Sequence, residues 1–143
     1  MILFDVNVLV YAHRSERPEH GPIAAWLSDI VNADQAFGVA DLVLSGFLRI
    51  VTNPKIFEIP TPLPKALAFA HELRNRPNRV DVRPGNRHWE LFISLCERAG
   101  VKGNLVADAY LAALAIESGS EWTTTDRDFS RFPGLYWRHP LEP

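Results

Sequence analysis

The sequence predicts an α/β fold, a three-layer α/β/α sandwich around a mostly parallel central sheet. Short apolar runs that suit buried strands alternate along the chain with longer segments whose apolar residues recur at helical spacing. This alternation is typical of a parallel sheet with helices on both faces. The chain has 143 residues, 47% hydrophobic and 22% charged, and we therefore expect one compact domain over residues 1–143.

The first part of the chain is expected to hold two strands and three helices. Residues 1–4 are a continuous apolar run and predict a buried strand, and residues 6–12 follow it at once as a helix. A proline and a Gly-Pro pair then break the chain. Residues 23–31 and 41–51 carry apolar side chains at helical spacing, and residues 36–39 between them can form a short strand.

The middle of the chain begins with an irregular segment. Residues 52–64 contain four prolines and cannot form a regular element, but their apolar side chains would be wasted in a free linker. We therefore expect an ordered surface loop. A helix over 63–73, a strand over 80–82 and a helix over 89–99 are predicted to follow it.

The last part is dominated by an almost wholly apolar helix over 105–117, which we expect to be buried nearly all round. Asn104 is placed to cap its start and Gly119 to stop it. Strands are expected at 122–125 and, at the end of the chain, at 135–137.

Three acidic residues stand at places where a carboxylate is costly to bury. Asp5 directly follows the first strand, Asp126 follows the strand at 122–125, and Asp108 interrupts the apolar helix. Taken alone, Asp108 can be a first-turn acid favoured by the helix dipole, and Asp126 or Asp128 can cap a turn. Sites in open parallel sheets form beyond the carboxyl ends of strands, so together they indicate a cluster that holds a cation.

The expected cation is Mg²⁺ or Mn²⁺, because hard oxygen ligands without His or Cys suit these ions. Such a centre supports phosphodiester hydrolysis by a metal-activated water. Thr124 is placed to hydrogen-bond a carboxylate or a metal-bound water, and Asp128 is expected to be structural or supporting.

The sequence resembles the PIN-domain ribonucleases, and among them the VapC-type toxins of toxin–antitoxin pairs. The matching stretches occur in family order over nearly the whole chain, at residues 2–9, 47–54, 106–111 and 124–129. The resemblance implies a magnesium- or manganese-dependent endoribonuclease, a homodimer and a cognate antitoxin. It also implies that Asp5, Asp108 and Asp126 are the metal-site acids, and that Asn7 and Thr124 are supporting polar residues.

One position departs from the family pattern. Aligned on Leu48 and Arg49, the usual glutamate of this helix is replaced by Gly46, which removes one carboxylate. Ser45 and Asp41 are possible substitutes, although Asp41 can simply be the helix cap. The number of metal ions held, one or two, stays open.

Two alternatives to a nuclease follow from the same residues. The replacement at Gly46 allows a PIN-like domain with weakened catalysis that acts as an RNA- or protein-binding module. A haloacid-dehalogenase-like phosphatase also opens with an Asp after a strand, but that chemistry requires Asp-x-Asp and Asn7 occupies the second position.

Nucleic-acid contacts must come from a local patch, because the net charge is −2 and the pI about 6.2. The densest basic stretch holds Arg74, Arg76 and Arg79, which can contact RNA or simply form a solvated loop, and Arg14 is a further candidate. No apolar run is long enough for a membrane span and no signal peptide is expected, so the predicted location is the cytoplasm.

Overall fold

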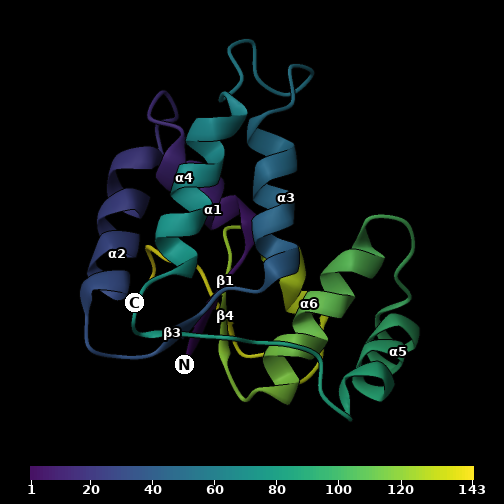
Figure 1. The fold of residues 1–143 in the computed structure, drawn as a ribbon. Coiled ribbons are helices and arrows are strands. Elements are labelled where there is room, and N and C mark those ends of the chain that lie inside the picture. The colour runs from purple at the N-terminus through teal and green to yellow at the C-terminus, as the bar shows by residue number, and fades with distance from the viewer.

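A computed structural model describes residues 1–143 and shows a five-stranded parallel sheet between two layers of helices (Figure 1). The strands are β1 (Ile2–Phe4), β2 (Phe37–Gly38), β3 (Arg79–Val80), β4 (Glu121–Thr123) and β5 (Trp137–Arg138). The helices are α1 (Val6–His13), α2 (His20–Asn32), α3 (Asp41–Val51), α4 (Leu63–Arg74), α5 (His88–Ala99), α6 (Leu105–Glu117) and the 3₁₀ helix η1 (Arg127–Arg131). This confirms the predicted fold class.

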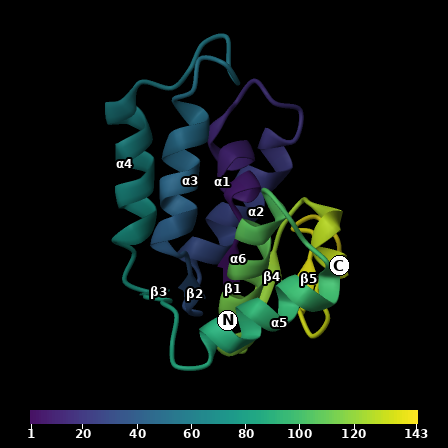
Figure 2. The same cartoon turned by 90° about the vertical axis from the view of Figure 1, so that its right-hand side faces the viewer.

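The strand order is β3-β2-β1-β4-β5, with every neighbouring pair parallel. The chain steps one way from β1 to β3, then crosses to the other side of β1 for β4 and β5. Because such crossovers are right-handed, helices α1–α4 lie on one face, and α5 and α6 on the other (Figures 1 and 2). None of the helices has both the length and the apolar character needed to cross a membrane.

The central strand β1 is covered on both faces, which explains its uninterrupted apolar sequence. Leu3 and Phe4 are buried, and the Phe4 ring packs on Phe37 of β2 with centroids 5.5 Å apart. Gly38 has no room for a side chain, since a Cβ there would lie 2.3 Å from Leu3 Cδ2 and 2.8 Å from Val82 Cγ2. Gly38 therefore leaves room for the side chains of Leu3 and Val82 to pack over β2.

Several predicted boundaries shift while the elements remain. Helices 41–51 and 105–117 form as predicted, but β3 occupies Arg79–Val80 instead of 80–82, and β5 occupies Trp137–Arg138 instead of 135–137. In both cases the neighbouring strand fixes the register: Arg79 pairs with Phe37, and Trp137 with Trp122. These long-range pairings are invisible to local apolar patterns.

The predicted cap of α6 by Asn104 is wrong. Its backbone is already helical (φ −62°, ψ −23°) and its side chain makes no capping hydrogen bond. Instead, the N–H groups of Leu105 and Val106 donate to the carbonyls of Lys102 and Gly103. Gly119, with φ +64°, ends the helix region as expected.

Two burial predictions hold only in part. Within the loop at 52–62, Phe57 is buried as expected, but Ile56 and Ile59 are 48% and 79% exposed. The first turn of α6 is also exposed at Val106 and Ala107, so this helix is not buried all round. Both exposed regions border the candidate site.

Candidate active site

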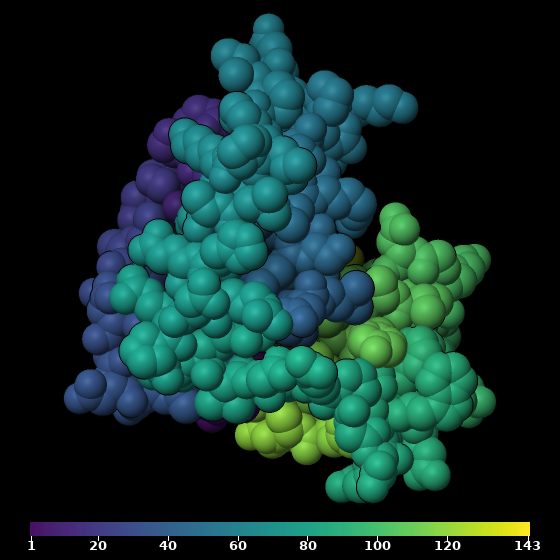
Figure 3. Space-filling model, viewed as in Figure 1, coloured from purple at the N-terminus to yellow at the C-terminus, as the bar shows by residue number.

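A cleft of about 590 Å³ opens at the carboxyl edge of the sheet, between α1, α3 and α6. The surface is visibly hollowed between α3 and α6 (Figure 3). All three predicted acids line it, because Asp5 directly follows β1, the segment after β4 carries Asp126, and the first turn of α6 carries Asp108. Asn7 and Ser45 line the same cleft.

Asp5 is the deepest of the three acids, 6% exposed at the junction of β1 and α1. Its Oδ1 accepts the Val6 N–H at 2.7 Å, and its Oδ2 accepts the Thr124 hydroxyl at 2.7 Å and the Asn7 amide at 3.0 Å. Burial raises the pKa of Asp5 to about 6, although the hydrogen bonds from Thr124 and Val6 lower it. The charge of Asp108 also raises this pKa. The ionised form of Asp5 therefore lacks a compensating positive charge.

Asn7 and Thr124 join the end of β1 to the segment after β4. The Thr124 hydroxyl oxygen accepts the Asp126 N–H at 3.0 Å and the Asn7 amide at 3.1 Å. The Asn7 Oδ1 in turn accepts the Thr125 N–H at 3.0 Å. Two acids from distant parts of the sequence are thus held by one polar network.

Asp108 is half-buried, and its pKa is raised by burial and by the charge of Asp126, against a lowering effect of Arg131. No hydrogen bond contributes to that pKa shift. Asp126 caps η1, accepting the Asp128 N–H at 2.9 Å. Asp126 is therefore both a turn cap and a residue of the cleft.

Asp128 is a more peripheral residue. Its side chain is 65% exposed and lies 3.8 Å from the Arg131 guanidinium. It does not line the cleft. Its charge does act on the site, because it contributes to the raised pKa of Asp108.

The donor set fits a hard divalent cation. The polar groups of the cleft include three carboxylates, an amide and a hydroxyl, which are oxygen ligands of the kind that Mg²⁺ and Mn²⁺ prefer. Carboxylates that repel each other and resist ionisation are stabilised by such an ion. No three His, Cys, Asp or Glu side chains converge tightly enough here to hold an ion, so shared coordination would require side-chain movement.

Comparison with known proteins gives the family. The PIN domain family model matches residues 2–135. This chain belongs to the PIN-domain family. Ribonuclease VapC43 of Mycobacterium tuberculosis is 44% identical over 142 residues, covering 99% of this chain and 97% of the relative. Ribonuclease VapC25 of the same organism is 41% identical over 143 residues, covering 100% and 99%. Within the PIN domains, the chain therefore belongs with the VapC ribonucleases.

Solved structures show the same fold at low sequence identity. VapBC2 from Rickettsia felis, bound to a promoter DNA fragment, has a TM-score of 0.69 at 18% identity, covering 97% of this chain and 98% of that one. VapC20 of Mycobacterium tuberculosis, a Sarcin-Ricin loop cleaving toxin, has a TM-score of 0.69 at 14% identity, covering 94% and 98%. A haloacid-dehalogenase-like phosphatase is not supported by any of these matches.

Gly46 and Ser45 of this PIN domain both line the cleft, whereas Asp41 does not. A Cβ at Gly46 would lie 3.0 Å from Val6 Cγ2, so the glycine permits close approach of α3 to α1. Asp41 is instead paired with Arg74, with Nε and Oδ1 3.0 Å apart. Ser45 is thus the better placed of the two possible substitutes for the missing glutamate.

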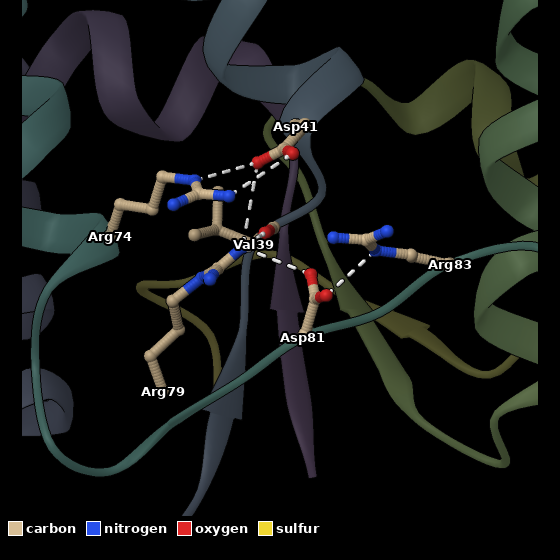
Figure 4. Close-up of polar contacts among 6 residues, drawn as sticks. All are labelled: Val39, Asp41, Arg74, Arg79, Asp81 and Arg83. Atoms are coloured by element: carbon tan, nitrogen blue, oxygen red, sulfur yellow. Dashed lines mark hydrogen bonds and ion pairs between the residues drawn. The ribbon is translucent and has the colours of Figure 1, made fainter.

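The densest basic stretch forms an ion-pair network with its own acids (Figure 4). Its members are Asp41, Arg74, Arg79, Asp81 and Arg83. Arg79 is central: its side chain is 8% exposed, and its guanidinium lies 3.5 Å from Asp41 and 3.4 Å from Asp81. It also donates to the Val39 carbonyl at 3.2 Å. We call this set the arginine network.

The other two predicted RNA contacts are also engaged within the protein. Arg76 lies 3.7 Å from Glu72, and Arg14 pairs with Glu16 at 2.6 Å while stacking 4.1 Å above the Phe57 ring. None of the four predicted arginines lines the acidic cleft. Their part in RNA binding stays a prediction.

Two cations that do line the cleft, Arg17 and Arg49, were not predicted. Neither forms an ion pair within 4.0 Å. Arg49 could have been found, because it follows Ser45 by four residues and so shares a face of α3. Arg17 lies in the loop before α2, and no local pattern places it.

Proposed function

We propose that this PIN domain is a metal-dependent endoribonuclease that uses Mg²⁺ or Mn²⁺. The observation that carries the proposal is that Asp5, Asp108 and Asp126, from three distant segments, line one cleft without a cationic partner among them. The relatives at 41% to 44% identity are named ribonucleases, which supports RNA as the substrate.

A bound divalent ion would supply an activated water and neutralise the charge that develops on the scissile phosphate. The residues of the chain hold and orient that centre. Asp5 is fixed by Val6, Asn7 and Thr124, so its carboxylate cannot turn freely. Asp108 has no such restraint, which leaves it free to follow an ion. One carboxylate oxygen of Asp126 accepts the Asp128 N–H at the start of η1, which restrains this side chain.

We also propose that the chain is the toxin of a toxin–antitoxin pair, acting as a homodimer in the cytoplasm. Solved structures of the same fold include VapBC assemblies and a toxin–antitoxin complex from Klebsiella pneumoniae. An acidic cleft can receive an antitoxin arm that carries Arg or Lys, which would pair with the carboxylates. Expression of the chain alone should inhibit growth, and the product of a neighbouring gene should relieve the inhibition. Harmless expression of active protein without an antitoxin would contradict the toxin role.

The enzymatic proposal is tested by cleavage of a labelled single-stranded RNA. Purified protein should cleave it in Mg²⁺ or Mn²⁺, lose the activity on chelation, and recover it when metal is restored. Cleavage that persists in excess chelator would contradict metal dependence. RNA binding with no cleavage under any metal would favour the alternative, a PIN-like binding module.

A further inference from the structure

A second pocket joins the acidic cleft and continues away from the acids. It has a volume of about 670 Å³ and lies between the segment after α1 and the loop at 52–62. Arg17, Ile56 and Phe57 line both the cleft and this pocket, so the two form one continuous depression. We call this depression beyond the acids the basic tract.

Three positive side chains line the cleft and the tract, progressively farther from the acids. Ser45 and Gly46 line the cleft beside the acids, and Arg49 follows one turn farther along α3. Arg17 marks the junction, and Lys65 lies in the pocket beyond it. None of these three cations has an ion-pair partner within 4.0 Å. Two acids also line the pocket, Glu16, which pairs with Arg14, and Glu58, so an anion entering the tract would meet an excess of positive charge.

Phe57 holds two guanidinium groups close together at the junction. Arg14 lies 4.1 Å and Arg17 5.2 Å from the centroid of the buried Phe57 ring. Arg14 is also fixed by Thr61, by the Ile59 carbonyl and by Glu16. Arg17 has no ion pair or side-chain hydrogen bond of its own, and the nearby Glu16 carboxylate, which feels its charge, is already paired with Arg14. The Arg17 guanidinium therefore remains available to a ligand.

We propose that Arg49 and Arg17 bind consecutive backbone phosphates of the RNA on one side of the scissile bond, and that the pocket beyond Arg17 receives the strand as it leaves the cleft. This inference rests on the proposed ribonuclease function. Proteins that bind single strands with little sequence preference usually have a groove of positive side chains that runs along the nucleic-acid backbone. Arg17 and Arg49 are therefore positioning residues of the reaction, separate from the acids that hold the metal.

The test measures binding of a short fluorescent single-stranded RNA of mixed sequence, by anisotropy over a salt series with chelator present. Arg17→Gln and Arg49→Gln should each reduce the slope of log K against log salt by about 0.7, the value for one lost phosphate contact on a single strand. Arg17→Lys keeps the charge and should keep the slope. Arg98→Gln is the matched control, because Arg98 is exposed and unpaired on α5, away from the cleft.

The same variants are then assayed for cleavage in Mg²⁺. Arg17→Gln should raise KM and leave kcat nearly unchanged, since the acids are intact. Wild-type salt slopes and KM for both glutamine variants would overturn the inference while leaving the ribonuclease intact, and so would slopes that fall equally in Arg98→Gln. If the wild-type protein neither binds nor cleaves RNA, the proposed function itself fails. Loss of binding to an antitoxin without loss of RNA binding would identify the tract as a protein surface and overturn the inference.

Discussion

The acidic cleft and the arginine network lie at the same edge of the sheet but differ in how their charges are compensated. In the network, Asp41 and Asp81 each lie within 3.5 Å of a guanidinium group. In the cleft, burial and the charges of neighbouring acids raise the pKa values of Asp5 and Asp108. Charge that the fold compensates internally serves structure, and charge left uncompensated indicates a ligand.

The largest difference between the two regions should appear when one acid of each is neutralised. Asp108→Asn should reduce RNA cleavage by at least about a hundredfold. Mutation of residues that only hydrogen-bond to a metal ligand already reduces metal affinity or activity by about 10–100-fold. The thermal melting of Asp108→Asn should not decrease, since no hydrogen bond is lost. Asp41→Asn, an exposed partner of Arg74, should leave cleavage unchanged and cost about 0–1 kcal/mol. Equal activity of the two variants would remove the distinction between the regions.

A second test uses the pH dependence of stability in the metal-free protein. The folded pKa of Asp5 is about 6 against an ordinary value of 3.8, so the folded state binds the proton more tightly than the unfolded chain. The contribution of Asp5 to stability is therefore present at low pH and lost as the pH rises through 6. The free energy of unfolding should fall by roughly 2–3 kcal/mol between pH 4 and pH 7 from this group alone.

Denaturant titrations with chelator present, at several pH values, measure this effect. The matched protein is Asp5→Asn, which cannot titrate at this position and should lack the decrease whatever its absolute stability. A decrease of the same size in both proteins would assign it to other groups. The uncompensated charge in the cleft would then not reside on Asp5.

Substitutions in the arginine network are expected to change the stability of the protein rather than its activity. Arg79→Gln removes a largely buried guanidinium and its bond to the Val39 carbonyl, while Asp41 and Asp81 stay partly exposed. The cost should be about 1–2 kcal/mol in the free energy of unfolding. Cleavage per folded molecule should remain at the wild-type level. A selective loss of RNA affinity, with stability unchanged, would instead support the RNA contact predicted for this stretch.

The sequence predicted the elements and the acids of the cleft better than it predicted the basic residues. Asp5 and Asp108 interrupt apolar segments, which marks their positions clearly, and Asp126 directly follows a predicted strand. Arg74 and Arg79 are conspicuous in sequence, but their partner Asp41 lies more than thirty residues earlier. Whether an arginine is paired depends on such long-range contacts, and so does the position of Arg17.

Gly46 provides the smallest and most specific test, because it lies in the cleft but against α1. Gly46→Ala should change stability by less than about 1 kcal/mol, since the gain in helix propensity offsets a Cβ placed 3.0 Å from Val6 Cγ2. Gly46→Glu introduces the acid that the resemblance to the family implies at this position, and it should strengthen binding of Mg²⁺ or Mn²⁺. Calorimetric metal titration and thermal melting of both variants measure these effects.

The alanine variant separates two effects of the glutamate side chain, steric overpacking against Val6 and the addition of a metal ligand. If Gly46→Glu loses about 1–3 kcal/mol while Gly46→Ala does not, the carboxylate is overpacked against Val6 and the glycine serves close helix packing. If Gly46→Glu is as stable as Gly46→Ala and binds metal more tightly, a carboxylate at position 46 can reach the ion and act as an additional ligand. Unchanged stability with unchanged metal affinity would show that position 46 of α3 does not reach the ion, and Ser45, which points in a different direction from the helix, would remain the candidate on α3.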